Sequence, residues 1–577
     1  MSVPERDIYE FDDFRLDAVK RVLLRRGELL PLTPRVFDTL LYFVRLHGKV
    51  IKKDELMRAI WPDSFVEENN LNQNVSTLRR TLGKHRYIVT VPGSGFRFAA
   101  EVKIISGPAE SVSADGIQAK TIAVLPFKPI VELGRDQALE LGMADTLIAR
   151  LSNSRRLIVR PLSSVRRYGG LEQDPQAAGR ELEVEAVLDG SLQRSADRIR
   201  LTARLINVVD GASLWVGMFD EKATDVFAVQ DAISERVAGA LALSLSSEER
   251  RGLNKRYTEN LEAYDLYLKG RYCWNKLIPP EIRKSIQFFQ QAIDLDPTYA
   301  LAYAGMAEAY RSVPINSDVP PDDAFPLAHA AAAKALEIDE TLADVHATLS
   351  ILHSWYDWDW ASAEREAKRA LILNPNSSEA HRAYALLLST LGRQKEAIAA
   401  AGRARELDPL ALITRTHESL FLYYDGRDEE ATEKLAKTLE IDPNFWIALL
   451  TLAKIHIRQG KYDEAIAELI KARNTSGGNT QTISLIGYAY ALLGDHAQAR
   501  AVLDELKALS KQRYVPLYNI AVIHNGLGEE EETLTWLERA HKERDVLLSA
   551  FITVDPSWKR LRANPRFVEI LKGMNLE

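Results

Sequence analysis

Glycine recurs every 34 residues through the C-terminal half of this chain, and this spacing limits the fold more than any other feature. The five glycines are Gly392, Gly426, Gly460, Gly494 and Gly528. Small residues stand five positions after each, at Ala397, Ala431, Ala465, Ala499 and Thr533, and seven before each, at Ala385, Ser419, Ala453, Gly487 and Ala521. Pro375, Pro409 and Pro443 follow the same step. The lattice predicts a helix-turn-helix unit with a glycine turn, close helix crossing at the small residues, and a proline that starts the next unit.

The same register extends toward the N-terminus. Trp358 takes the place of glycine in an earlier unit, with Ala363 and Pro375 in phase. A still earlier unit is stretched by roughly ten residues around 314–325. We count about eight units between residues 266 and 547, followed by a capping tail. Residues 260–577 resemble tetratricopeptide repeats, and this resemblance implies an all-α solenoid.

The first helices of such units line a concave surface. Aromatic and basic side chains in a groove suit an extended peptide or a partner helix. The predicted partner-binding residues are Trp355, Tyr356, Arg382, Tyr423, Lys454, Arg458 and Tyr488. Taken one at a time, each is better explained by packing between units, so both interpretations stay open.

Residues 1–103 combine short strands with three helices. Residues 8–17 and 20–31 alternate and turn as strands do. Pro34 and Gly48 bracket a first helix, and further helices are predicted at about 53–60 and 68–82. Residues 86–100 predict a hairpin that turns at 92–95.

The third of these helices has two distinct faces. Leu71, Val75, Leu78 and Leu82 form an apolar stripe, which predicts the buried face. The opposite face carries Asn69, Gln73, Ser76, Thr77 and Arg80. Asn and Gln can bond adenine in two places, and Arg can bond guanine likewise. The alternative is a solvated face without a function, and the pattern alone does not decide between them.

Residues 31–98 resemble the OmpR/PhoB-type winged-helix family, a common output domain of phosphorelays. The motifs that carry the resemblance are LTPRVFDTLLYF, KKDELMRAIWP, NVSTLRRTLG and VPGSGFRF. The resemblance implies a short sheet, three helices and a hairpin wing. It also implies that the third helix enters the major groove of double-stranded DNA, while the wing at 93–97 reaches the neighbouring minor groove.

The resemblance assigns roles to individual side chains. We expect Asn69, Gln73, Asn74 and Thr77 to contact bases, and Arg79, Arg80, Lys84, Arg86, Ser94 and Arg97 to contact phosphates. Charge agrees weakly with this. The chain has a net charge of −7, but residues 1–103 hold 18 Lys and Arg against 14 Asp and Glu, a net +4. A homodimer on DNA is compatible with these roles.

A winged helix at the start of the chain resembles the layout of CadC-like one-component regulators. We therefore expect no receiver domain ahead of it. Members of that group usually continue into a membrane span, whereas no apolar stretch of spanning length occurs here.

Residues 104–120 are small, polar and turn-forming, which predicts a linker. Residues 121–247 then mix predicted strands at 121–127, 156–165 and 186–220 with helices at 136–154 and 226–245, which indicates an α/β domain. The motifs IAVLPF, GMADTLIARLS and LWVGMFD resemble a TolB N-terminal-like or FlgO-like domain. This resemblance implies an architecture and no chemistry, so ligand sensing and a spacer or dimerisation role stay open.

No catalytic motif emerges from the chain. It lacks a phosphate-binding GxxxxGK[ST], a GxGxxG, an HExxH and a CxxC, and its histidines are scattered in sequence. A single cysteine, Cys273, excludes an intramolecular disulfide and fits a reducing compartment. We therefore predict no enzyme, no cofactor, no metal ligand and a cytoplasmic location.

Together these patterns predict a multidomain protein with an α+β winged helix, an α/β middle domain and an all-α solenoid. The predicted function is sequence-specific transcription regulation, with the repeats binding a protein partner or a second copy. The alternative is a non-enzymatic scaffold whose winged helix docks protein.

Overall fold

A computed structural model describes residues 8–17, 22–25, 28–30, 32, 34–60, 68–83, 87–92, 94–105, 120–129, 137–152, 154, 156–170, 174–195, 198–222, 226–241, 255–274, 279–316 and 319–576. The chain divides into two compact units, residues 1–115 and 116–577. Each unit is described by itself below. Among the described helices, none combines the length and the apolar character that crossing a bilayer requires.

The N-terminal unit contains two small sheets. The first has the strand order β4-β3-β2-β1-β8, formed by β1 (Ile8–Phe11), β2 (Phe14–Asp17), β3 (Val22–Arg25), β4 (Glu28–Leu30) and β8 (Lys103–Ile105). The second has the order β5-β7-β6, formed by β5 (Val50–Ile51), β6 (Ile88–Val91) and β7 (Gly95–Phe98). Residues 104 and 105, which we assigned to the linker, instead extend the edge strand β8 and pair with β1.

Three helices complete this unit: α1 (Pro34–Arg45), α2 (Lys53–Ile60) and α3 (Glu68–Leu82). The bounds of α2 and α3 are the predicted ones. One core joins helices and sheets, with Phe11, Phe14 and Phe98 fully buried beside Leu40 and Leu78. The β6–β7 hairpin is the predicted wing.

The second unit begins with a mixed sheet of order β11-β9-β12-β13-β14, with β10 also on β12. Its strands are β9 (Thr121–Val124), β10 (Lys128–Pro129), β11 (Ile158–Val159), β12 (Ala186–Ser195), β13 (Arg198–Asn207) and β14 (Ser213–Lys222). Strands β9, β11 and β12 run parallel, whereas β12, β13 and β14 form an antiparallel meander. The helices are α4 (Gln137–Leu151), α5 (Leu162–Val165), α6 (Pro175–Glu181) and α7 (Val226–Ala240).

One strand prediction in this region was wrong. Residues 156–165 form only the two-residue strand β11; Pro161 then precedes helix α5 as its N-cap residue, and the 3-10 turn Arg166–Tyr168 follows the helix. The proline ring fixes φ of Pro161 at a value suited to a helix start. The apolar run around it has the length of a strand, and the prediction followed the run instead of the proline.

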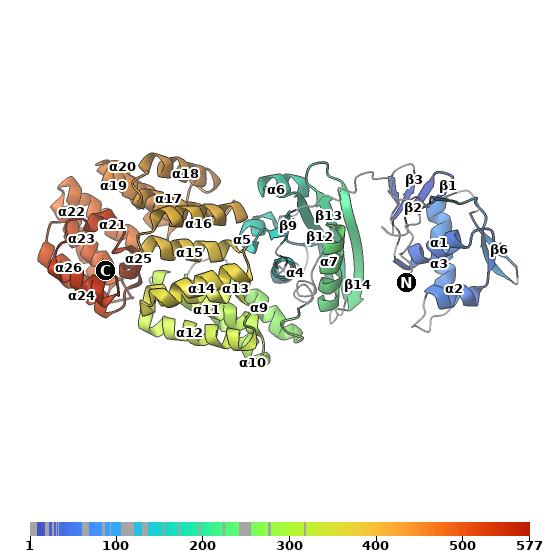
Figure 1. The fold of residues 1–577 in the computed structure, drawn as a ribbon, viewed down its shortest axis with the longest axis horizontal. Helices are drawn as coiled ribbons and strands as arrows, with labels where there is room; N and C mark the ends of the chain where they lie inside the picture. Colours follow the sequence, from blue (N-terminus) through green and yellow to red (C-terminus); the bar gives the residue numbers. More distant parts are fainter. Residues whose placement is uncertain are drawn as a thin grey trace. The chain divides into compact units, whose positions relative to one another are not determined.

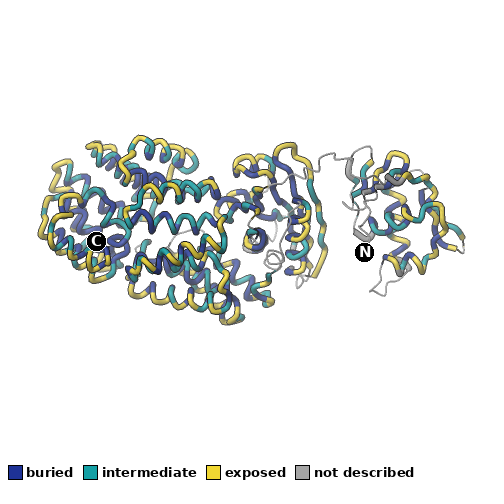
Figure 2. Tube along the Cα trace, viewed as in Figure 1, coloured by how far each residue is buried: buried dark blue, intermediate teal, exposed yellow. Residues whose placement is uncertain are grey.

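Eight helix pairs follow in the described part of the array, in agreement with the predicted count (Figure 1). They are α9 (Leu261–Trp274) with α10 (Pro279–Leu295), α11 (Ala300–Ser312) with α12 (Pro321–Ile338), α13 (Ala343–Leu352) with α14 (Trp360–Leu373), α15 (Ser378–Thr390) with α16 (Gln394–Leu407), α17 (Leu412–Tyr424) with α18 (Asp428–Ile441), α19 (Trp446–Arg458) with α20 (Tyr462–Thr475), α21 (Thr480–Leu493) with α22 (His496–Leu509), and α23 (Leu517–Gly526) with α24 (Glu530–Lys542). Buried and exposed positions alternate along these helices (Figure 2).

The five lattice glycines all adopt the left-handed conformation between paired helices, with φ from 75° to 91°. Trp358 takes this conformation too, at φ 56°, in the unit where it replaces glycine. The small residues on either side of each glycine are buried, as the lattice predicts. The glycine marks a turn geometry, and the small residues mark where the helix pairs cross.

The middle domain and the array share one hydrophobic core. Leu268 of α9 packs against Gly142 of α4, where any side chain would clash with it. The Tyr264 hydroxyl lies 2.7 Å from both the Thr146 hydroxyl and the Gln230 amide nitrogen. The sequence predicts separate domains at 121–247 and 260–577, whereas the described parts of residues 116–577 pack as one unit.

The C-terminal tail folds back onto earlier repeats. It contains α25 (Val546–Phe551), the 3-10 turn Pro556–Trp558 and α26 (Pro565–Gly573). The Trp358 indole N–H donates to Ser549 at 2.8 Å, and the Trp360 indole N–H donates to the Met574 carbonyl at 2.8 Å. The tail therefore contacts the third helix pair, α13 with α14, and also covers the last pair, α23 with α24.

Candidate functional site

Helix α3 presents a polar face away from the core of the N-terminal unit. Leu71, Val75, Leu78 and Leu82 are buried at 2% exposure or less. On the other side Gln73, Ser76 and Arg80 are exposed, and Thr77 is half-buried at its flank. The predicted division of the helix is therefore present, and an amide, a hydroxyl and a guanidinium are free to approach a groove.

Two of the predicted contact residues are engaged inside the domain. The Asn74 amide donates to the Thr39 hydroxyl of α1 at 3.1 Å. Arg79 donates from Nε to the Ile88 carbonyl at 3.0 Å and from a terminal nitrogen to the Thr90 hydroxyl at 2.7 Å. Asn74 thus fixes α3 against α1, and Arg79 fixes α3 against the wing.

The wing turns at Gly95, which has φ 128°. A side chain there would meet the Ile51 carbonyl oxygen, so only glycine fits. Ser94 and Arg97 are exposed on the wing. Of the remaining predicted positions, Lys84, Arg86 and Gly93 lie outside the described residues, as does the side chain of Asn69.

Asn72 is an exposed amide that the sequence analysis did not single out. It lies four residues before Ser76, one helical turn away on the same side of α3. Its polarity and this spacing were available in the sequence, and they would have placed it with the predicted base contacts.

A second candidate site is an open cavity of about 2200 Å³ lined by the helix pairs and the middle domain. Three of the seven predicted groove residues line it: Trp355, Arg382 and Lys454. Arg382 donates from Nε to Glu379 at 2.7 Å, and Lys454 pairs with Asp555 of the C-terminal tail at 2.9 Å. Trp355 is 7% exposed and mostly part of the core.

The other four predicted groove residues make contacts within the chain. Tyr356 donates to Asp322 at 2.9 Å, and burial together with that carboxylate raises the pKa of Tyr356 to about 12. The Arg458 guanidinium lies 3.9 Å from the centre of the buried Tyr423 ring, and burial lowers the pKa of Arg458. Tyr423, Arg458 and Tyr488 line a smaller cavity of about 220 Å³ beside the tail.

Charged side chains of both signs line the large cavity. Arg271 pairs with Glu308 at 3.0 Å, and Arg311 lies 3.7 Å from Glu379. Burial raises the pKa of Glu308 to about 7, outweighing the opposing pull of Arg271. The cavity wall therefore offers both signs of charge to an occupant.

The described residues also contain one group of three side chains within reach of a single metal ion: His329, His353 and Asp357. Burial alone would raise the pKa of Asp357, but the two nearby imidazoles, His329 and His353, outweigh it and lower that pKa. The sequence predicts no metal ligand, because its histidines are scattered along the chain. Only the packing of α12 against the end of α13 brings these groups together.

Two parts of the chain match known families. Residues 27–98 match the family described as "Transcriptional regulatory protein, C terminal", and residues 422–481 match a tetratricopeptide repeat family. These matches cover the winged helix and the centre of the array, while the middle domain has no part in either.

Several curated proteins are similar to the chain. Putative adenylate cyclase 3 of Rhizobium meliloti (strain 1021) is 31% identical over 240 residues, which cover 41% of this chain and 40% of that protein. The transcriptional regulator HilA of Salmonella typhi is 22% identical over 425 residues, which cover 72% and 73%. The transcriptional activator CadC of Escherichia coli (strain K12) is 35% identical over 83 residues, which cover 14% and 16%. The chain thus spans about two fifths of the length of the cyclase.

Among solved structures, the DNA-binding domain of E. coli CadC aligns with 17% of this chain and 98% of its own length, with 28% identity and a TM-score of 0.16.

Proposed function

We propose that this chain is a sequence-specific, DNA-binding transcription regulator whose winged helix reads the major groove through α3. The observation that carries the proposal is the exposed polar face of α3 above its buried stripe, in a domain that matches a transcription-regulator family. Similarity to HilA and CadC, both named as transcription regulators, supports it.

Within this proposal the predicted contact residues fall into two groups: exposed side chains that contact DNA, and side chains that are bonded inside the domain and orient α3. Gln73, with Thr77, Asn69 and the added Asn72, reads base edges, while Arg80, Arg97 and Ser94 hold phosphates. Asn74 and Arg79 act chiefly by orienting α3, because their side chains already bond α1 and the wing. Lys84 and Arg86 remain predicted phosphate contacts.

The proposal for the repeats is that the large cavity binds an extended segment of a protein partner. Its volume of about 2200 Å³ exceeds the roughly 300–1,000 Å³ typical of small-molecule sites. Arg382 and Lys454 supply charge on its wall, and Trp355 supplies an aromatic edge. The array thereby couples a partner to the DNA-binding domain without any catalytic step.

The division of the chain also belongs to the proposal: a DNA-binding domain that ends with β8 at Ile105, a linker, a TolB N-terminal-like or FlgO-like domain at 121–247 and the repeats at 260–577. The mixed sheet with its long β12–β13 hairpin supports the middle assignment. Because this domain shares a core with the first repeats, its role is to brace the array.

Fluorescence anisotropy with the full chain tests the DNA-binding function, on genomic sites found by footprinting and on random duplexes. Gln73→Ala should reduce discrimination between site and random DNA by about 1–3 kcal/mol. Arg80→Ala should weaken binding to every sequence and lower the salt dependence by about one phosphate contact.

The control for both variants is Arg15→Ala, an exposed arginine on β2 of the other sheet, which should leave binding unchanged. Equal affinity of the wild-type chain for genomic and random DNA would overturn the proposal and favour a scaffold that docks protein through its winged helix.

A further inference from the structure

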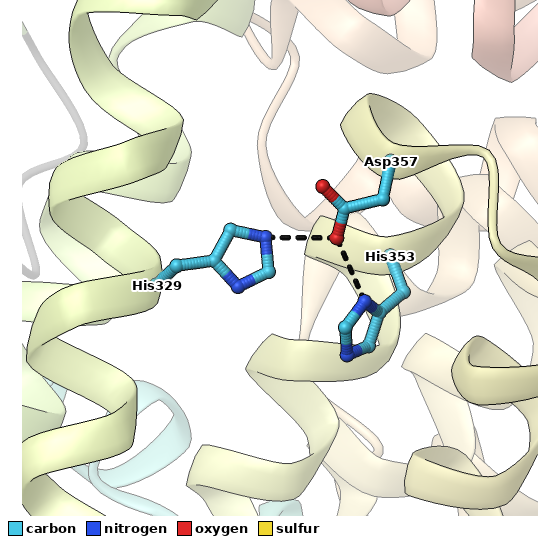
Figure 3. A group of neighbouring side chains, drawn as sticks. All are labelled: His329, His353 and Asp357. Carbon is cyan, nitrogen blue, oxygen red and sulfur yellow. Dashed lines mark hydrogen bonds and ion pairs between the residues drawn. The ribbon is translucent and has the colours of Figure 1, made fainter.

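His329, His353 and Asp357 converge on one point of the repeat array (Figure 3). Nδ1 of His353 lies 2.7 Å from Oδ2 of Asp357, and Nε2 of His329 lies 2.9 Å from the same oxygen. Nε2 of His329 is buried, yet it makes no hydrogen bond of ordinary geometry. Two imidazole nitrogens thus face one carboxylate, and one of them is left without a satisfactory partner.

The backbone holds these donors from two elements. His329 lies on α12, whereas His353 and Asp357 belong to a five-residue π-helical turn, His353–Asp357, at the end of α13. The wider turn lets the His353 carbonyl accept from the Trp358 and Asp359 amides, and it leaves the side chains at 353 and 357 on the same side. Such turns are rare and occur often at functional sites.

We propose that His329, His353 and Asp357 bind a Zn²⁺ ion, with water as the fourth ligand. Imidazole and carboxylate are ordinary Zn²⁺ donors, and three protein ligands with one open position is a common zinc arrangement. Ca²⁺ and Mg²⁺ prefer all-oxygen ligands, so this donor set selects against them. The three side chains retain 23% to 30% of their exposure, which leaves room for water.

The distances are close to those the ion requires. With Zn–N and Zn–O bonds of about 2.0–2.2 Å in a tetrahedron, ligand atoms stand about 3.3 Å apart. The two nitrogen–oxygen separations here are 2.7 and 2.9 Å. Small side-chain rotations that widen each gap by about 0.5 Å would admit the ion without moving the helices.

An ion at this position joins the second helix pair to the third. The adjacent Trp358 donates to Ser549 of the C-terminal tail, and the Tyr356 carbonyl accepts from Arg544. Zinc binding therefore fixes the turn on which the tail rests. This role is independent of the DNA-binding function.

The test uses the full chain, stripped of metal with a chelator, and titrates it with Zn²⁺ by calorimetry and with Co²⁺ by visible absorption. We expect one tight Zn²⁺ per chain, a tetrahedral Co²⁺ spectrum, and a higher thermal unfolding midpoint in Zn²⁺. His353→Gln and Asp357→Asn should each weaken binding by more than the roughly 10- to 100-fold that loss of an outer-shell partner costs.

The matched control is His346→Gln, which removes another histidine paired with a carboxylate, Glu366, at 2.6 Å on neighbouring α13 and α14. It should bind Zn²⁺ as the wild-type chain does. Circular dichroism of the metal-free variants checks that each one folds. Absence of tight Zn²⁺ binding in the wild-type chain, or unchanged binding in a folded His353→Gln variant, overturns the proposal.

Discussion

Asp545 shows how a single buried carboxyl responds to its surroundings. It is fully buried at the start of α25, where it accepts from the Leu547 amide and the Tyr518 amide, each at 2.9 Å. Burial raises the pKa of Asp545 to about 6 despite those amides. The C-terminal tail, which contacts the third helix pair, therefore begins at Asp545, a carboxyl whose ionised form is disfavoured in the folded state.

This shift predicts a pH dependence with a definite sign. Because the folded pKa lies above the unfolded value, the stabilisation from protonated Asp545 is complete below about pH 4 and is lost as pH rises through about 6. Asp545→Asn removes this contribution. The stability difference between wild type and variant should therefore be larger at pH 4 than at pH 7, by about 2–3 kcal/mol, as measured by urea denaturation.

Asp495→Asn provides the matched control, since Asp495 caps α22 in the same way but is exposed. The Asp495→Asn variant measures what the loss of an exposed cap costs by itself. A pH-independent difference for Asp545→Asn would contradict the predicted shift.

At the scale of elements, a turn can be recognised either by its residue type or by its phase in the repeat. Gly460 has φ 75° and open space where a side chain would stand, so only the backbone requires glycine there. Trp358 holds the equivalent conformation with a large side chain, which is 6% exposed and bonded to Ser549. Contacts with the tail compensate for the strain at Trp358, whereas the glycine turns have no strain to offset.

Two glycine substitutions should therefore change stability in opposite directions. Gly460→Ala should lower the free energy of unfolding by about 1–2 kcal/mol, because the left-handed conformation disfavours Cβ. Gly402→Ala, inside helix α16 with only the Glu418 carboxylate at 3.8 Å, should raise it by about 0.5–1 kcal/mol. Chemical denaturation of the full chain measures both, and a stabilised Gly460→Ala variant would refute the backbone argument.

At the scale of the whole second unit, Arg160 joins the middle domain to the array. Its guanidinium donates to the Leu182 and Glu183 carbonyls at 2.8 Å within the middle domain. It also donates to the Glu406 and Leu407 carbonyls at the end of α16, at 2.8 and 2.6 Å. The middle domain therefore contacts the fourth helix pair as well as the first. Arg160 supplies the hydrogen bonds that join the middle domain to the fourth pair.

Removing the Arg160 guanidinium should destabilise the middle domain and the end of α16 together. Arg160→Met should lower the free energy of unfolding by about 3 kcal/mol, because four carbonyls lose their donor and two of those hydrogen bonds are buried. Amide hydrogen exchange should rise at 157–168 and 404–411 together.

The comparison variant is Arg198→Ala, which breaks the exposed pair with Asp220 and should lower the free energy of unfolding far less than Arg160→Met does. Unchanged amide exchange at 404–411 in Arg160→Met would show that Arg160 does not stabilise the end of α16.

The sequence by itself determined the local elements of this protein. The 34-residue lattice predicted eight helix pairs and the turn at Trp358, and the apolar stripe of α3 predicted its buried face. These succeed because helix period, turn geometry and close helix crossing each depend on residues near in sequence. The candidate DNA-reading face belongs to this class, since a single helix carries it.

Only the tertiary structure decided the contacts between distant segments. Asn74 bonds α1, and the tail contacts Trp358. His329 lies beside Asp357, and the middle domain shares a core with the first repeats. No spacing in the sequence encodes these pairs, because they depend on which apolar faces meet when the array curls. The seven groove residues illustrate the difference: their helices were predictable, but whether each faced a cavity or a neighbour was settled by packing.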